Sequence, residues 1–330
     1  MFRMKILCGF LLLLLVSLNG LAAKIVTPTA QIMPYPEGGA PTEQQIQLGK
    51  QLFFEPLLSK SGKMSCATCH NPNLGFGDAR QFSLGDNGEP LIRHTPHLYN
   101  IGFAKTLFWD GRAATLEQQA LMPIINPLEM NLPLDEMMLR LNSFSFYKEA
   151  FNEHYGALTI ENVAKAISAF ERSLITPNSP FDRFIAGDAN AISSLAKQGW
   201  QLYNGKANCF SCHDGADLSH VRFDNIGMGV KDVGRQPFAT QDEGNALGKF
   251  KPPGLRNVAL TAPYMHDGSI GTLEEVIRFY MRGGDFDENK SAQISKMDLT
   301  EQEVSALLAF LGTLTDPLVI QIPEPVHSAK

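Results

Sequence analysis

The pattern C-x-x-C-H occurs twice in this chain, as CATCH at residues 66–70 and as CFSCH at residues 209–213. This spacing is typical of a site where two cysteines form thioether bonds to a haem and the adjacent histidine ligates the iron. A single match would also suit a redox-active or zinc-binding cysteine pair. Two matches, which use every cysteine except Cys8, predict two c-type haems. The predicted attachment residues are Cys66, Cys69, Cys209 and Cys212, and the predicted proximal ligands are His70 and His213.

The N-terminus has the pattern of a secretory signal peptide. Arg3 and Lys5 precede an almost wholly apolar run at residues 6–18, and the small residues Ala22 and Ala23 follow it. A membrane anchor is the alternative, but the run is shorter than the roughly 18–20 residues that a spanning helix needs. We therefore expect residues 1–23 to be a cleaved signal peptide and the protein to be periplasmic, because c-type haems are attached outside the cytoplasm.

Length and charge narrow the class of protein further. The 330 residues are enough for about two domains. The formal net charge of −6 argues against binding to nucleic acid, which requires a basic surface. An acidic protein can still attract a basic redox protein. With four of the five cysteines assigned to haem, no disulfide is expected.

An internal echo predicts two similar domains. GWQLY at residues 199–203 resembles GKQLF at residues 49–53, and each precedes a C-x-x-C-H motif. Helices are expected from Thr42 to Phe53, over residues 160–174, and after two capping-box patterns that begin at Thr272 and Thr300. Strand signals are few. The predicted fold is mainly α, with two cytochrome c-like haem domains, residues 24–180 and 181–330, packed around an inter-haem region.

Three further segments resemble a known family. FWDGR at residues 108–112, PLEMN at 127–131 and PYMHDG at 263–268 are similar to signatures of the bacterial dihaem cytochrome c peroxidases and the related MauG proteins. The resemblance covers about residues 49–311. It implies that hydrogen peroxide reacts at the N-terminal haem, which receives electrons from the C-terminal haem. It also implies a small redox donor, a cytochrome c or a cupredoxin, or a protein substrate, and it is compatible with a homodimer.

The resemblance assigns roles to individual residues. Glu129 matches the distal acid–base residue of the family, and Gln119 matches its partner in the distal pocket. A carboxylate near the iron can move a proton between the two peroxide oxygens when desolvation raises its pKa. Trp109 matches the indole between the two haems, although a buried packing role is compatible with the same residue. Arg112 and His266 are expected near haem propionates.

The sixth ligand of the second haem separates two branches of the family. The position fourteen residues after His266 carries Met in the peroxidases and Tyr in the MauG-like proteins, and here it is Tyr280. Met281 is the adjacent alternative, but helix neighbours point about 100° apart, so only one of the two can face the iron. Tyr280 is the preferred ligand, which favours the MauG-like branch.

Two other positions depart from the peroxidase pattern. Residues 71–93 contain no histidine, so we expect an open distal face at the first haem, with His94 and His97 as the nearest groups that could close it. The family also binds calcium between the haems, using an asparagine in an R-N-x-P segment. Residues 93–96 here read RHTP, and imidazole is a poor ligand for calcium. The carbonyl groups of Thr261 and Pro263 are the candidate calcium ligands that this chain keeps.

Three functions follow from these observations. The first is a dihaem peroxidase that reduces hydrogen peroxide. The second is a MauG-like enzyme that oxidises residues of a partner protein. The third is a non-catalytic electron carrier with two closed haems, which Glu129 and Gln119 argue against because a closed haem has no use for a distal acid.

Overall fold

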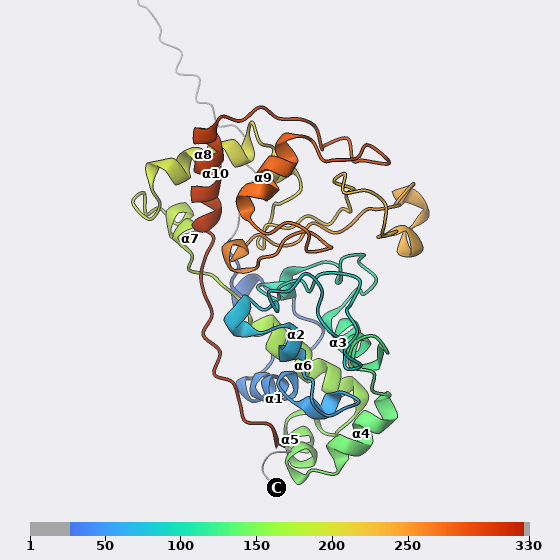
Figure 1. Ribbon diagram of the computed structural model, residues 1–330. Coiled ribbons are helices and arrows are strands. Elements are labelled where there is room, and N and C mark those ends of the chain that lie inside the picture. Colours follow the sequence, from blue (N-terminus) through green and yellow to red (C-terminus); the bar gives the residue numbers. More distant parts are fainter. Residues whose placement is uncertain (1–26, 327–330) are drawn as a thin grey trace, which may run out of the picture.

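A computed structural model describes residues 27–326, which form two helical bodies (Figure 1). The predicted signal peptide, which includes Cys8, lies outside the described residues. Strands are absent from this part of the chain, where the β pairing consists of isolated bridges. The mainly α fold is therefore confirmed. The helices are α1 Glu43–Phe53, α2 Cys66–Cys69, α3 Leu116–Ile125, α4 Leu134–Asn142, α5 Ser145–Tyr155, α6 Ile160–Ser173, α7 Pro180–Ile185, α8 Ser194–Asn204, α9 Leu273–Met281 and α10 Glu301–Gly312.

The helices begin where the sequence predicts them. Thr42, Thr272 and Thr300 each accept a hydrogen bond from a backbone N–H in the first turn, and the side chain at the third helical position bonds back to the cap. These capping boxes pair backbone donors that the first turn of a helix would otherwise leave free. The predicted starts of α1, α9 and α10 are confirmed.

Each body is built on a crossing of two helices at a glycine. A Cβ added at Gly49 on α1 would lie 1.7 Å from the carbonyl oxygen of Ala166 on α6. A Cβ added at Gly199 on α8 would lie 1.9 Å from the carbonyl oxygen of Ala306 on α10. Only glycine allows the two backbones to approach this closely. The echo between residues 49–53 and 199–203 therefore marks the same crossing in both domains.

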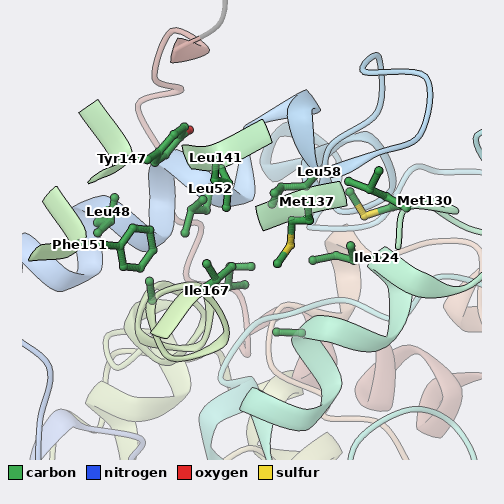
Figure 2. Close-up of a cluster of buried hydrophobic side chains, with 14 of the residues drawn as sticks. Leu48, Leu52, Leu58, Ile124, Met130, Met137, Leu141, Tyr147, Phe151 and Ile167 are labelled. Atoms are coloured by element: carbon green, nitrogen blue, oxygen red, sulfur yellow. The ribbon is translucent and has the colours of Figure 1, made fainter. Parts of the chain in front are cut away.

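Each domain has its own apolar core. In the first, Leu52, Tyr147 and Ile167 are among the fully buried side chains contributed by α1, α5 and α6 (Figure 2). In the second, Phe310 of α10 packs against Phe181 with ring centroids 5.2 Å apart. Burial of such side chains is the main force that holds each set of helices together.

The chain returns to the first domain after α10. Residues 315–326 run beside the first domain, as the red trace in Figure 1 shows. The backbone N–H of Val326 donates to the carboxylate of Glu55 at 2.9 Å, and the side chain of Gln51 donates to the carbonyl oxygen of Glu324 at 2.8 Å. The sequence predicts the second domain to run to residue 330; in the structure the tail bonds to the second domain at Asp316, whose N–H donates to Asn257, and to the first at residues 324–326.

Loops between the two bodies form the inter-domain contact. The backbone N–H of His94 donates to the carbonyl oxygen of His266 at 2.8 Å, and that of Lys251 donates to the carbonyl oxygen of Trp109 at 2.8 Å. Arg93 forms ion pairs with Asp110 at 2.5 Å and with Asp232 at 2.6 Å. Except for the pair of Arg93 and Asp110, which lies within the first domain, these bonds join segments that precede and follow the second motif. Among the described residues, no helix is both long and apolar enough to cross a membrane.

Candidate functional site

The first C-x-x-C-H motif lies on a cavity of about 440 Å³. Cys66, Cys69 and His70 all line this cavity. The Nδ1 atom of His70 lies 3.0 Å from the carbonyl oxygen of Phe76, to which it can donate a hydrogen bond. This bond orients the ring and leaves Nε2 as the ligating nitrogen. Burial lowers the pKa of His70, which favours the neutral imidazole that a metal requires.

The second motif lies on a separate cavity of about 210 Å³. Cys209, Cys212 and His213 line it. The Nδ1 atom of His213 lies 3.1 Å from the carbonyl oxygens of both Leu218 and Pro253. The two histidines are thus held in the same way, by a backbone carbonyl on Nδ1.

The residues fit a covalently attached haem better than zinc or a redox-active dithiol. Burial raises the pKa of Cys66, Cys69, Cys209 and Cys212. Reactive cysteines of redox-active dithiols are thiolates, which need a lowered pKa. Within residues 27–326, no group of three or more His, Cys, Asp or Glu side chains is arranged to hold a metal ion. A cavity beside each motif and an oriented histidine are what a tethered haem needs.

Glu129 and Gln119 both line the first cavity. Glu129 follows α3 in a tight turn, where its N–H donates to the carbonyl oxygen of Asn126 at 2.9 Å. The Asn126 side chain in turn donates to Oε1 of Glu129 at 2.7 Å. Burial raises the pKa of the Glu129 carboxyl, and the bond from Asn126 and the charge of Arg112 only partly oppose this. The structure therefore brings the predicted acid–base pair to the cavity of His70.

Trp109 is the one described residue that lines both cavities. Its indole Nε1 donates to the carbonyl oxygen of His94 at 2.7 Å, and its side chain is buried. Trp109 is thus a buried packing residue that lines both cavities, and its position between two haems stays a prediction.

The two residues predicted to lie near propionates occupy different cavities. Arg112 lines the first cavity, where its guanidinium lies 3.6 Å from the ring centroid of Phe108 and pairs with Asp110 at 2.8 Å. His266 lines the second cavity and stacks on Phe250, with ring centroids 3.8 Å apart. Their roles towards a haem remain predictions.

Tyr280 and Met281 point in different directions at the end of α9. Tyr280 lines the second cavity with His213, whereas Met281 packs against the apolar core of the second domain. Met265 and Met297 also line this cavity. Burial raises the pKa of the Tyr280 phenol. The sixth ligand remains a prediction, for which Tyr280 has the position that Met281 lacks.

His94 and His97 both line the first cavity. Nδ1 of His94 lies 2.9 Å from the carbonyl oxygen of Arg80, and Nε2 of His97 lies 2.9 Å from that of Gly254. One nitrogen of each ring is thus hydrogen-bonded to the backbone.

The predicted calcium ligands are Thr261 and Pro263. The hydroxyl of Thr261 donates to the carbonyl oxygen of Val258 at 3.1 Å, and calcium binding by the two residues stays a prediction.

The sequence motifs missed one acidic residue of the first cavity. Glu171 on α6 lines that cavity and is only 5% exposed. The sequence predicts a helix with an apolar face over residues 160–174, and the motifs assign no role to the glutamate within it. The signal that could have found it is the repeat, because the matching helix of the second domain carries Leu311 at this place.

Two helical domains, each with a C-x-x-C-H motif on a cavity and an oriented histidine, define a two-domain c-type cytochrome. Residues 43–190 match the family model described as di-haem cytochrome c peroxidase, and residues 196–315 match that of cytochrome c. The methylamine utilization protein MauG of Methylorubrum extorquens is 39% identical, with 88% of this chain and 84% of that protein aligned. The cytochrome c551 peroxidase of Nitrosomonas europaea is 34% identical, with 89% and 86% aligned.

A solved structure agrees with these relatives. The crystal structure of a MauG-like protein associated with microbial copper homeostasis superposes with a TM-score of 0.79 at 34% identity, covering 86% of this chain and 92% of that one. The chain therefore belongs to the di-haem cytochrome c peroxidase family of oxidoreductases. Its cytochrome c domains bind haem covalently.

Proposed function

We propose that this protein reduces hydrogen peroxide in the cavity of His70 and receives electrons through the cavity of His213. The observation that carries this proposal is the position of Glu129, a carboxyl with a raised pKa in the first cavity. A haem bound at His70 supplies the iron that delivers electrons to peroxide. The peroxidase and MauG relatives support this reaction class.

The chain's own residues handle the proton. As a carboxylate, Glu129 can accept a proton from one oxygen of peroxide and return it to the other oxygen, which then leaves as water. The bond from Asn126 to Oε1 holds the carboxyl, and the proposed proton transfer uses Oε2. Gln119, which lines the same cavity, can donate a hydrogen bond to peroxide and orient it.

Electrons reach the first cavity from the second in this proposal. Trp109 lines both cavities, so its indole offers a route between them. The electron donor is a small redox protein, a cytochrome c or a cupredoxin, that docks near the second domain. We further propose that residues 1–23 are cleaved and that the protein is exported to the periplasm, the compartment of such donors.

The second candidate is a MauG-like oxidation of residues in a partner protein. The observation that favours it is Tyr280, which lines the second cavity while Met281 does not. A phenolate ligand would stabilise ferric iron and lower the reduction potential, whereas a thioether would raise it. The electron-carrier alternative is less favoured, because Glu129 and Gln119 supply the first cavity with acid–base groups.

Visible and EPR spectra of the fully ferric protein, before and after one equivalent of hydrogen peroxide, test the proposal. An open first haem gives a high-spin signal that peroxide removes, and Glu129→Gln should slow this reaction by roughly 10²–10⁴-fold. Glu153→Gln, at an exposed glutamate of α5, is the matched control and should react like the wild type. Two low-spin haems that ignore peroxide, in the ferric state and after partial reduction, would leave the electron carrier as the function.

A further inference from the structure

The first cavity contains a second carboxyl besides that of Glu129. Glu171 projects from α6 into the cavity that His70 also lines. Its side chain is buried, and its Oε2 atom has no hydrogen-bond partner among the described residues. A buried, unpaired carboxyl oxygen is costly, so a residue kept in this state calls for a function.

The internal repeat shows that packing does not require a glutamate here. The crossing of α1 and α6 matches that of α8 and α10, because Cβ atoms at Gly49 and Gly199 would meet Ala166 and Ala306. The next helical turn places Phe170 and Phe310 against the same glycines. One residue further on, Glu171 therefore corresponds to Leu311, and each lines the cavity of its own domain. A leucine fills the equivalent place in the second domain.

The charges around Glu171 do not neutralise it. Burial raises the pKa of Glu171 to about 8, the charge of Arg172 opposes this, and that of Glu117 adds to it. The Arg172 guanidinium is instead held by Glu117 of α3, with N–O distances of 2.5 and 3.1 Å. The other titratable or charged groups that line this cavity are Cys66 and Cys69, which haem attachment would convert to thioethers, His70, His94, His97, Glu129, Asp110, Arg93 and Arg112.

We propose that Glu171 binds a proton when the haem at His70 gains an electron and releases it when that haem is oxidised. Reduction removes one positive charge from the iron, so the buried carboxylate loses a stabilising field and takes a proton from solvent. The electron comes from the one-electron donor of the peroxidase. This inference rests on the proposed peroxide reaction at His70.

Glu171 then fills a gap that Glu129 leaves in the proton balance. Reduction of hydrogen peroxide to two waters consumes two electrons and two protons. Glu129 moves a proton from one oxygen to the other and adds none. A carboxyl that is protonated with reduction and deprotonated with oxidation releases one of these protons into the cavity as the haem passes its electron to peroxide, and the other proton comes from solvent.

The test is the reduction potential of each haem in the intact protein, measured by spectroelectrochemistry from pH 5 to pH 9. The variants are Glu171→Gln, which keeps the shape of the side chain without its charge, and Glu171→Leu, which introduces the residue type found at the equivalent position 311 of the second domain. In the wild type, the potential of the first haem should fall as the pH rises, because the carboxylate stabilises the ferric state. Both variants should lose this slope and should have a higher potential than the wild type at pH 9. At pH 5 the potentials should converge on that of the wild type, since Glu171 is then protonated in both redox states.

The second haem is the internal control, since Leu311 replaces the carboxyl there, and its pH dependence should be the same in all three proteins. A first-haem slope that survives in both variants would overturn the inference, because another group would then bind the proton. If Glu171→Gln attaches fewer than two haems, the slope in Glu171→Leu decides. The potentials are measured without peroxide, so a failed Glu171 prediction is distinct from a failed Glu129 prediction.

Discussion

The indole Nε1 of Trp109 donates a hydrogen bond of 2.7 Å to the backbone carbonyl oxygen of His94. The N–H of His94 in turn donates to the carbonyl oxygen of His266 at 2.8 Å. Trp109 and His94 line the first cavity, and Trp109 and His266 line the second. Two hydrogen bonds thus join the walls of the two cavities, one from the indole of Trp109 and one from the backbone of His94.

Trp109→Phe should weaken both this link and the fold. Phenylalanine keeps an aromatic ring at this position but has no N–H. The buried carbonyl of His94 therefore loses its donor, which should lower the free energy of unfolding by about 1–3 kcal/mol. Electron transfer from the second haem to the first should slow in stopped-flow absorption. Trp200→Phe is the control, since Trp200 stacks on Tyr203 in the second domain with ring centroids 5.6 Å apart and lines neither cavity. Equal transfer rates in both variants would remove Trp109 from the path.

Tyr280→Phe should change the visible and EPR spectra of the second haem while both haems stay attached. The phenol oxygen is the predicted ligand, and phenylalanine fills the same space without it. Met281→Leu is the control and should leave the spectra unaltered, because Met281 packs in the core instead of lining the cavity. If Met281→Leu alters the spectra and Tyr280→Phe does not, the ligand assignment is reversed.

Gly49→Ala and Gly199→Ala should each destabilise the domain that carries the glycine. The added methyl group would meet a backbone carbonyl oxygen at 1.7 and 1.9 Å, so the helices must move apart. We expect a loss of about 1–3 kcal/mol in urea unfolding, despite the better helix propensity of alanine. Gly312→Ala, with no neighbouring atom within 4 Å, is the control and should be neutral or slightly stabilising. Equal effects at all three glycines would argue against the close crossings.

The pair of Glu117 and Arg172 should make stability depend on pH. Burial would raise the pKa of Glu117, but its bonds with Arg172 outweigh this and hold the pKa below its usual value. The contribution is therefore present above the unfolded pKa of about 4.3 and is lost as the pH falls through the lower folded value. Glu117→Gln should cost about 1.5–3 kcal/mol in urea unfolding at pH 7 and much less near pH 3.

Glu161→Gln is the control for this pH experiment. Glu161 pairs with Lys165 at 2.6 Å, but side-chain exposures of 75% and 48% place the pair in solvent. Such an exposed pair contributes about 0.5 kcal/mol or less at either pH. A cost for Glu117→Gln that is the same at both pH values would show that packing, not charge, accounts for it.

The sequence alone determined the features that depend on neighbouring residues. Haem attachment needs two cysteines and a histidine within five positions, so residues 66–70 are enough to predict it. A capping box needs a threonine and a carboxylate or amide three positions apart, so Thr300 and Glu303 are enough to predict the start of α10. The echo of Gly49 and Gly199 predicted two alike domains because a close helix crossing allows no larger residue. Family motifs identified Glu129 and Trp109, although neither spacing nor composition shows which cavity each one lines.

Tertiary structure decided which distant residues share a cavity. Trp109 meets the second cavity only because its loop packs against residues 250–266, and residues 324–326 of the tail lie on the first domain through Glu55. Tyr280 and Met281 are neighbours in sequence, yet the packing of α9 turns one to the cavity and the other to the core. Glu171 reads as one polar residue in an apolar helix until the matching crossing sets it opposite Leu311. These relations depend on contacts between residues far apart in the chain, which local patterns do not encode.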